Sequence, residues 1–389
     1  MQLTRIILII FCGIWMTFPG YAQTDTTKPL KIAVFSPVYL DSAFNNTDYK
    51  LGRSNIPKYI LSGLDFHNGV MLAIDSLNTH KEPIEVFFYD SKSVTDPVTE
   101  VLERAELTDV SLIIASFNTR NDVKTLADFA LQHNVPLISS IYPNDGGVTA
   151  NPFFVMINPT LRTHIDAIYK YLHRIYPIEN ITLFRRKGAI EDMIQSVLNN
   201  INKRTQGVPL KLKIIELPDE FTTEEVTAGL DSTKKNVIVC GSLNETFGIN
   251  LVKAISSSKS YKAVIMGMPT WDAIKDMGKD AEIIYSTPYN FSRADKLFQQ
   301  LTDKYRSKYS GRPSDMFFKG FESMYHFTKL LLKHRNGLIN NLSDKEYKLF
   351  NDFDIQPVKS TKESILPDYL ENKKLYFIRK LDGQTKSIN

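Results

Sequence analysis

Short apolar runs alternate with amphipathic stretches along most of the chain. The clearest unit covers residues 112–142, where apolar runs at 112–115 and 135–138 flank a stretch whose apolar residues recur at helical spacings of three and four. A strand–helix–strand crossover makes its two strands parallel, so their carboxyl ends meet at one edge of a sheet. That edge is where α/β folds place ligands.

Both apolar runs end in polar, hydroxyl-rich loops, which together predict a binding surface. The loop residues predicted to contact a ligand are Ser116, Asn118, Thr119, Ser139, Ser140 and Tyr142. The alternative is that Ser116, Asn118 and Thr119 only cap the following helix. Capping explains the first loop about as well as binding does, but it says nothing about the second loop.

The same alternation extends from residue 31 to residue 287. Repeated strand–helix units of this length are typical of parallel sheets covered by helices. The number of strand–helix units is larger than one sheet usually holds. The pattern therefore predicts an α/β protein with two sheets.

The alternation of predicted strands and helices ends in the last hundred residues. Two helices without an obvious strand between them are predicted at 295–309 and 313–334, and the aromatic stripe of the second is expected in the core. A terminal pair of strands is predicted at 353–358 and 374–379, followed by a turn at Asp382–Gly383.

The first residues predict export. Arg5 precedes an apolar run at 6–15, and small residues before position 23 predict a signal peptide, residues 1–22, cleaved after Ala22. The run is short for a membrane span, and no later stretch is long and apolar enough. Cys12 is a candidate for lipidation, but Phe11 before it fits a lipobox poorly, so we expect a soluble exported protein.

Composition and motifs exclude several functions. The formal charge of +4 falls to +3 without the signal peptide, and its dispersal gives no reason to expect nucleic-acid binding. No GxGxxG, Walker, HExxH or GxSxG motif is present, so neither a cofactor, a metal site nor an enzyme is expected.

The order of elements resembles the type I periplasmic binding proteins, whose best-known members bind leucine, isoleucine and valine for transport. The most specific segments are "GLDFHNGVMLAIDSLN" from Gly63, "DVKTLADFALQHNVPLIS" from Asp122 and "NPFFVMINPTLRTHIDAI" from Asn151. The resemblance covers almost the whole mature chain. It identifies a fold more firmly than a ligand, because none of the segments is a catalytic motif.

The resemblance implies two Rossmann-like lobes with parallel sheets, joined by three crossings. Lobe one is expected to hold residues 30–155 and 283–337, and lobe two residues 156–282 and 338–389. A ligand is expected between the lobes, which would close on it by a hinge motion.

The resemblance also implies that loops of lobe two complete the site. The matching positions are Arg185, Arg186, Ser242, Asn244 and Trp271. For Trp271, stacking on a ligand and ordinary packing in the core are equally good interpretations.

One departure from the family bears on the ligand. Amino-acid binders carry a carboxylate for the ammonium group after the turn that matches residues 266–271, and here Asp272 is close but shifted. Arg185 and Arg186 directly follow a predicted strand and precede a predicted helix, which favours an acidic ligand. The alternative is that these basic residues are simply solvated.

Two functions compete. The leading hypothesis is a periplasmic solute-binding protein that captures a small amino acid-like or acidic ligand for an ABC-type importer, whose permease complex would be a separate partner. The alternative is an envelope scaffold or activator of a cell-wall synthase that uses the same fold without transport. A long aromatic-containing loop at 39–59 offers a docking surface for the alternative.

Overall fold

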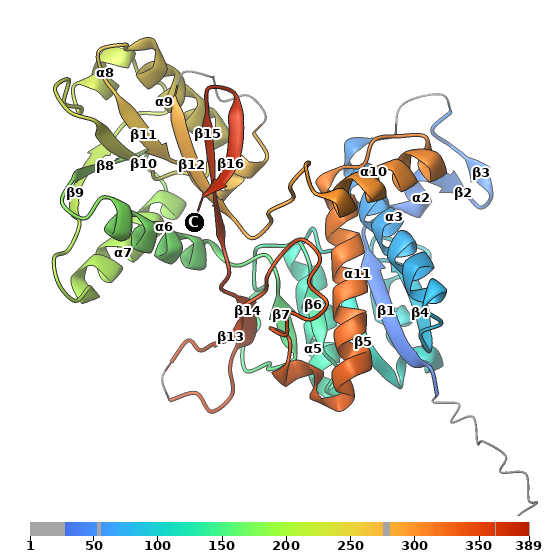
Figure 1. Ribbon diagram of the computed structural model, residues 1–389. Coiled ribbons are helices and arrows are strands. Elements are labelled where there is room, and N and C mark those ends of the chain that lie inside the picture. Colours follow the sequence, from blue (N-terminus) through green and yellow to red (C-terminus); the bar gives the residue numbers. More distant parts are fainter. Residues whose placement is uncertain (1–27, 53–55, 275–280, 362, 389) are drawn as a thin grey trace, which may run out of the picture.

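The computed structural model describes residues 28–52, 56–274, 281–361 and 363–388. These residues form two lobes, each built on a seven-stranded sheet with helices on its faces (Figure 1). The predicted signal peptide at 1–22, with Cys12, lies outside the described residues. Among the described helices, none combines the length and the hydrophobicity that crossing a bilayer requires.

Lobe one is organised around the sheet β13-β14-β7-β6-β5-β1-β4. Its central strands pair in parallel, as the alternation of strands and helices predicts. They are β1 (Leu30–Ser36), β4 (Ile84–Asp90), β5 (Val110–Ala115), β6 (Leu137–Ser139) and β7 (Phe154–Met156). The main helices of this lobe are α3 (Lys58–Thr79), α5 (Arg120–His133), α10 (Lys296–Tyr309) and α11 (Asp315–His334).

Lobe two is organised around the sheet β16-β15-β12-β11-β10-β8-β9. Its parallel strands are β8 (Asn180–Arg185), β9 (Lys211–Glu216), β10 (Asn236–Cys240), β11 (Ala263–Met266) and β12 (Glu282–Thr287). Its helices are α6 (Leu161–Ile175), α7 (Ala189–Arg204), α8 (Thr223–Thr227) and α9 (Glu245–Ser257). The two lobes are therefore built on the same plan, as predicted.

The core of lobe one depends on close packing between α3 and α11. A Cβ atom on Gly69 would lie 2.0 Å from the carbonyl oxygen of Phe317, and one on Gly320 would lie 2.2 Å from that of Phe66. Only glycine allows the two backbones to approach this closely. The aromatic stripe of α11 is buried against the sheet, which confirms its predicted place in the core.

The carboxyl-terminal strands correct the predicted lobe boundaries. β13 (Ile355–Val358) and β14 (Tyr369–Asn372) pair with each other, and β14 joins β7 in lobe one. β15 (Tyr376–Leu381) and β16 (Gln384–Ile388) form a hairpin in lobe two, around the turn predicted at Asp382–Gly383. The predicted pairing of 353–358 with 374–379 is wrong because the chain crosses between the lobes after β14.

Two assignments of residues to lobes change as a result. The segment 338–389, predicted to belong wholly to lobe two, contributes β13 and β14 to lobe one. β12 pairs with β11 and β15 in lobe two, so the second segment of lobe one begins after Thr287 rather than at residue 283. Such non-local pairing has no signature in local periodicity.

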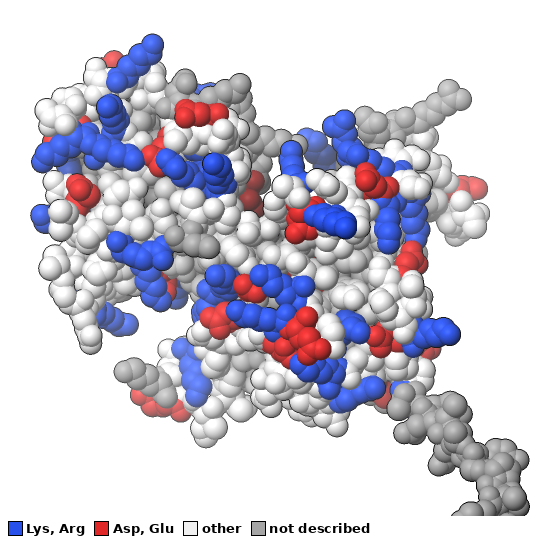
Figure 2. Space-filling view, viewed as in Figure 1, with Lys and Arg blue, Asp and Glu red and all other residues white. Residues whose placement is uncertain are grey.

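Charged side chains are spread over both lobes on the face that Figure 2 shows. On that face Lys and Arg side chains are more prominent than Asp and Glu over lobe two, whereas both signs are mixed over lobe one.

Candidate ligand-binding site

The predicted crossover is present as β5–α5–β6. Ala115 pairs with Ser139 in the parallel ladder, and the backbone N–H of Ser140 donates to the carbonyl of Ala115 at 2.9 Å. The backbone N–H of Ser116 donates to the carbonyl of Phe35 at 2.8 Å, which holds it beside the end of β1. Ser116, Ser139 and Ser140 therefore lie together at the carboxyl edge of the lobe-one sheet, as predicted.

The hydroxyl groups of these three serines are buried, and they have no hydrogen-bond partner among the described residues. Ser116, Ser139 and Ser140 are each at most 1% exposed, and no Oγ atom among them has a hydrogen-bond partner within the described part of the chain. A buried polar group left without a partner costs about 1–3 kcal/mol. Three such groups at one strand edge are donors that a polar ligand would satisfy.

Helix capping does not account for the first loop. Thr119 precedes α5, but its side chain makes no capping hydrogen bond. Its hydroxyl instead accepts a hydrogen bond from Nζ of Lys92 at 3.3 Å. The amide of Asn118 is exposed and donates to the hydroxyl of Tyr39 at 2.7 Å. The capping alternative thus loses its support.

Aromatic side chains flank the hydroxyl-rich loops. Tyr39 packs edge-on against Tyr59, with ring centroids 5.0 Å apart; Tyr39 follows β1, and Tyr59 lies in the first turn of α3, at the end of the loop predicted at 39–59. Tyr142 is half-buried and packs against the core of lobe one. The sequence shows aromatics in this loop, but it does not show that Tyr39 reaches Asn118.

The crossing after β12 adds residues that the sequence analysis missed. The hydroxyl of Tyr289 donates to the backbone carbonyl of Ser140, which ties this crossing to the end of β6. Nζ of Lys319, from α11, lies 3.9 Å from the centre of the Tyr289 ring. Such a position is a favourable cation–π arrangement. Burial raises the pKa of the Tyr289 hydroxyl, which therefore stays protonated and remains a donor.

Asp272 brings a carboxylate from lobe two to this cluster. It ends a short 3-10 helix, Pro269–Asp272, after β11, and accepts a hydrogen bond from the Thr287 hydroxyl at 3.3 Å. Its pKa is raised by desolvation, although Lys319 opposes that shift. Desolvation lowers the pKa of Lys319, and the charge of Asp272 opposes that shift in turn. Opposite charges from the two lobes therefore influence each other without forming a direct ion pair.

Arg185 and Arg186 are occupied by carboxylates of their own lobe. Arg185 is buried and bonds to Asp192 and to Gln195, at 2.5 Å each. Arg186 bonds to Glu191 at 3.0 Å and to Asp219 at 2.8 Å. An acidic ligand bound here would need free guanidinium groups, so this pairing weakens the part of the acidic-ligand prediction that rests on Arg185 and Arg186.

Ser242 and Asn244 also make contacts within lobe two. The hydroxyl of Ser242 donates to Glu191 at 2.6 Å, and the side chain of Asn244 caps α9 by accepting from the N–H of Phe247 at 2.8 Å. Burial raises the pKa of Glu191, but the hydrogen bonds from Ser242 and Arg186 outweigh it and leave that pKa lowered. Contact of Ser242 or Asn244 with a ligand remains a prediction.

Trp271 is packed in the core of lobe two. It is fully buried, and a Cβ atom on Gly267 would lie 2.1 Å from its ring. The structure therefore favours the packing interpretation of Trp271 over stacking on a ligand in this conformation.

Comparison with known proteins finds similarity in structure only. No family model matches the chain, and no curated protein matches it. A putative branched-chain amino acid ABC transporter protein from Rhodospirillum rubrum superposes with a TM-score of 0.64 at 11% identity, over 92% of this chain and 100% of that one. A periplasmic ligand-binding protein of a branched-chain amino acid ABC transporter from Burkholderia xenovorans gives 0.61 at 13% identity, over 92% and 94%.

A third solved structure contains a ligand. The ABC transporter substrate-binding protein from Desulfitobacterium hafniense in complex with leucine superposes with a TM-score of 0.55 at 12% identity, over 92% of this chain and 100% of that one. All three matches extend over both lobes. The sheet order, the crossings and these superpositions agree: the chain has the two-lobed α/β fold of the type I periplasmic binding proteins.

Proposed function

We propose that this protein is a solute-binding protein that captures a small polar ligand between its lobes for an ABC-type importer. The observation that carries the proposal is the group of three buried hydroxyls without partners, at Ser116, Ser139 and Ser140. They lie at the carboxyl edge of a parallel sheet, where α/β folds bind ligands. The similar structures from R. rubrum and B. xenovorans are described as parts of branched-chain amino acid ABC transporters, which supports the same role.

An amino acid-like ligand fits the charges around this edge. Serine hydroxyls are suitable donors to a carboxylate. Asp272 offers a carboxylate from the opposite lobe, and Lys319 offers a cation beside Tyr289. A ligand that carries both an ammonium and a carboxylate group would complement these partners. An acidic ligand held by Arg185 and Arg186 is less well supported, because both arginines already bind carboxylates.

Asp272 lies in lobe two, whereas the serines and Lys319 lie in lobe one, so a ligand that contacts all of them would join the two lobes and favour a closed form. A ligand shifts the population towards closure by the difference between its affinities for the two forms. In this proposal the protein is periplasmic, and the membrane permease complex is a separate partner.

A docking role is favoured by one separate observation. The hairpin of β2 (Phe44–Asn45) and β3 (Asp48–Tyr49) exposes two aromatic side chains, Phe44 at 38% and Tyr49 at 45%, with ring centroids 5.4 Å apart. Exposed aromatic residues are enriched in protein interfaces. The envelope-scaffold alternative would use this hairpin to bind a protein partner.

Native mass spectrometry of freshly exported protein, followed by small-angle scattering with the identified compound, tests the proposal. We expect an amino acid or a similar compound to copurify. At saturation it should reduce the radius of gyration and raise the melting temperature by mass action. If no compound from a broad screen of amino acids, peptides and sugars changes either quantity, the importer role is wrong and the scaffold role is favoured.

A further inference from the structure

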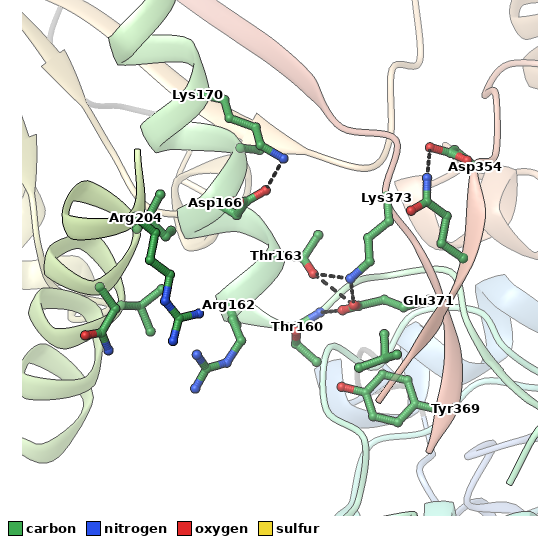
Figure 3. Close-up of a pocket in the computed structure, with 16 residues that line it drawn as sticks. Thr160, Arg162, Thr163, Asp166, Lys170, Arg204, Asp354, Tyr369, Glu371 and Lys373 are labelled. Atoms are coloured by element: carbon green, nitrogen blue, oxygen red, sulfur yellow. Dashed lines mark hydrogen bonds and ion pairs between the residues drawn. The ribbon is translucent and has the colours of Figure 1, made fainter. Parts of the chain in front are cut away.

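A cavity of about 610 Å³ lies where lobe two meets the strands β13 and β14 of lobe one (Figure 3). Helices α6 and α7 form one wall, and the two strands with the residues next to them form the other. None of the serines of the candidate ligand-binding site lines it, nor does Asp272 or Lys319. The cavity is therefore separate from the site described above.

Most charged groups that line this cavity already have partners. Lys170 pairs with Asp166 at 2.6 Å, and Lys373 pairs with Glu371. Glu371 is buried and also accepts hydrogen bonds from the backbone N–H of Thr160 at 2.6 Å and from the hydroxyl of Thr163 at 2.8 Å. The amino terminus of α6 is thus already capped by a carboxylate of lobe one.

Arg162 and Arg204 differ from these charged groups, because their guanidinium groups have no partner among the described residues. Within the described part of the chain, neither guanidinium makes an ion pair or a hydrogen bond, although both residues line the cavity. Figure 3 shows the two side chains reaching from α6 and α7 into the same space. Both residues are exposed, so their guanidinium groups are open to a ligand from solvent. An anion that lies between them would contact both positive charges.

The other side chains define what kind of anion fits. Guanidinium groups bind carboxylate and phosphate in a bidentate manner. Val197, Ile201, Val358 and the ring of Tyr369 line the same cavity and provide an apolar surface. The volume lies within the range of about 300–1,000 Å³ that is typical of small-molecule sites. The combination matches a small organic anion, with a carboxylate or phosphate head and an apolar body.

We propose that this cavity binds a small organic anion through Arg162 and Arg204. Because its walls come from both lobes, the bound anion would also favour one angle between them. The affinity of the cavity for the anion and the affinity of the main site for its ligand would then be coupled reciprocally. Binding of the anion itself does not depend on the importer role.

Calorimetry with phenyl phosphate, phenylacetate, inorganic phosphate and phenol tests the proposal. Wild type should bind phenyl phosphate or phenylacetate, and the stronger of the two identifies the preferred head group. Inorganic phosphate lacks the apolar body and phenol lacks the charge, so both should bind at least tenfold more weakly. The Arg162→Ala/Arg204→Ala double variant should lose at least tenfold in affinity for the preferred anion.

A control variant makes the result specific. Arg174→Ala removes one positive charge from α6, as Arg162→Ala does, but Arg174 lies over the Tyr171 ring and does not line the cavity, so binding should be unchanged. Absence of binding to wild type, equal binding by the double variant, or an equal loss in Arg174→Ala would each overturn the proposal.

Discussion

Glu322 on α11 accepts hydrogen bonds from both the backbone N–H and the side-chain amide of Asn351, at 2.8 Å and 2.5 Å. The side-chain oxygen of Asn351 in turn accepts from the N–H of Asn290 at 2.7 Å, on the crossing that follows β12. This buried chain connects the core of lobe one to a crossing between the lobes. Burial without a cation in contact raises the pKa of Glu322 to about 7, although the hydrogen bonds oppose this shift.

Glu322 should make the protein less stable as the pH rises towards neutral. Its pKa is about 7 in the folded state and 4.5 when unperturbed, so the folded state holds the proton more tightly between these values. The free energy of unfolding should therefore fall with rising pH in this window, by at most about 1.4 kcal/mol per pH unit. Urea unfolding of Glu322→Gln between pH 4.5 and 7 should lack this contribution. Identical pH slopes in wild type and variant would contradict the assignment.

His164 should have the opposite effect on the pH dependence of stability, because it should make the protein less stable as the pH falls. It is fully buried, one ring nitrogen lies 2.9 Å from the Ser286 hydroxyl, and burial lowers its pKa from 6.5 to about 3. The unfolded state binds the extra proton below pH 6.5, so this group lowers the free energy of unfolding as the pH falls from 6.5 towards 3. His164→Asn should unfold with a weaker dependence on acid. A variant with the acid dependence of wild type would show that His164 does not contribute.

The contact between Gly267 and Trp271 should limit substitution after β11. The Cβ atom of an alanine at position 267 would lie 2.1 Å from the indole ring, so the ring or the strand must shift. Overpacking of this kind typically costs about 1–3 kcal/mol. Gly337→Ala is the matched control, since the nearest atom there is 3.6 Å away. Trp271 is the single tryptophan after the predicted cleavage site, so intrinsic fluorescence reports both unfolding and ring displacement.

Local patterns predicted the elements better than they predicted their partners. The β5–α5–β6 crossover and its three serines follow from the spacing of apolar residues and the order of elements, which are properties of a short segment. The pairing of β14 with β7 joins residues more than 200 positions apart, which no periodicity records. Asp272, Tyr289 and Lys319 likewise come from three separate segments of the chain.

Arg185 and Arg186, at the end of β8, show the same limit in the candidate site. Their position at the end of a strand was predicted correctly. Their partners Asp192 and Asp219 lie 7 and 33 residues further along the chain. A basic pair therefore looks like an anion site in the sequence, whereas the folded chain supplies the carboxylates itself.

Arg186→Ala should consequently affect stability more than ligand binding. Glu191 is 4% exposed and would lose its charged partner, while the hydrogen bond from Ser242 remains. Removing one partner of a buried charged group costs about 1–3 kcal/mol or more. Lys187→Ala is the control, because Lys187 is 89% exposed and should change stability by less than about 0.5 kcal/mol. A large loss of ligand affinity in Arg186→Ala, without a loss of stability, would restore Arg186 to the binding site.

Ser139→Ala should weaken ligand binding without destabilising the ligand-free protein. The Ser139 hydroxyl is buried at the carboxyl edge of β6 and has no partner in the described structure, so alanine removes no hydrogen bond from the free protein. A ligand that accepts this hydrogen bond would lose about 1–3 kcal/mol, which corresponds to roughly a 5- to 150-fold change in Kd. Calorimetry with the amino acid identified by native mass spectrometry measures that change.

Ser36 supplies the matched control for this prediction. It is equally buried, at the end of β1 on the same sheet edge, but its hydroxyl donates to the carbonyl of Gly63 at 3.1 Å. Ser36→Ala should therefore lower the melting temperature, because it removes this buried hydrogen bond, and it should spare ligand affinity. The two substitutions, made at the same edge of one sheet, thus distinguish an effect on ligand binding from an effect on stability. A loss of ligand-free stability in Ser139→Ala, with affinity intact, would show that the Ser139 hydroxyl is structural rather than a ligand donor.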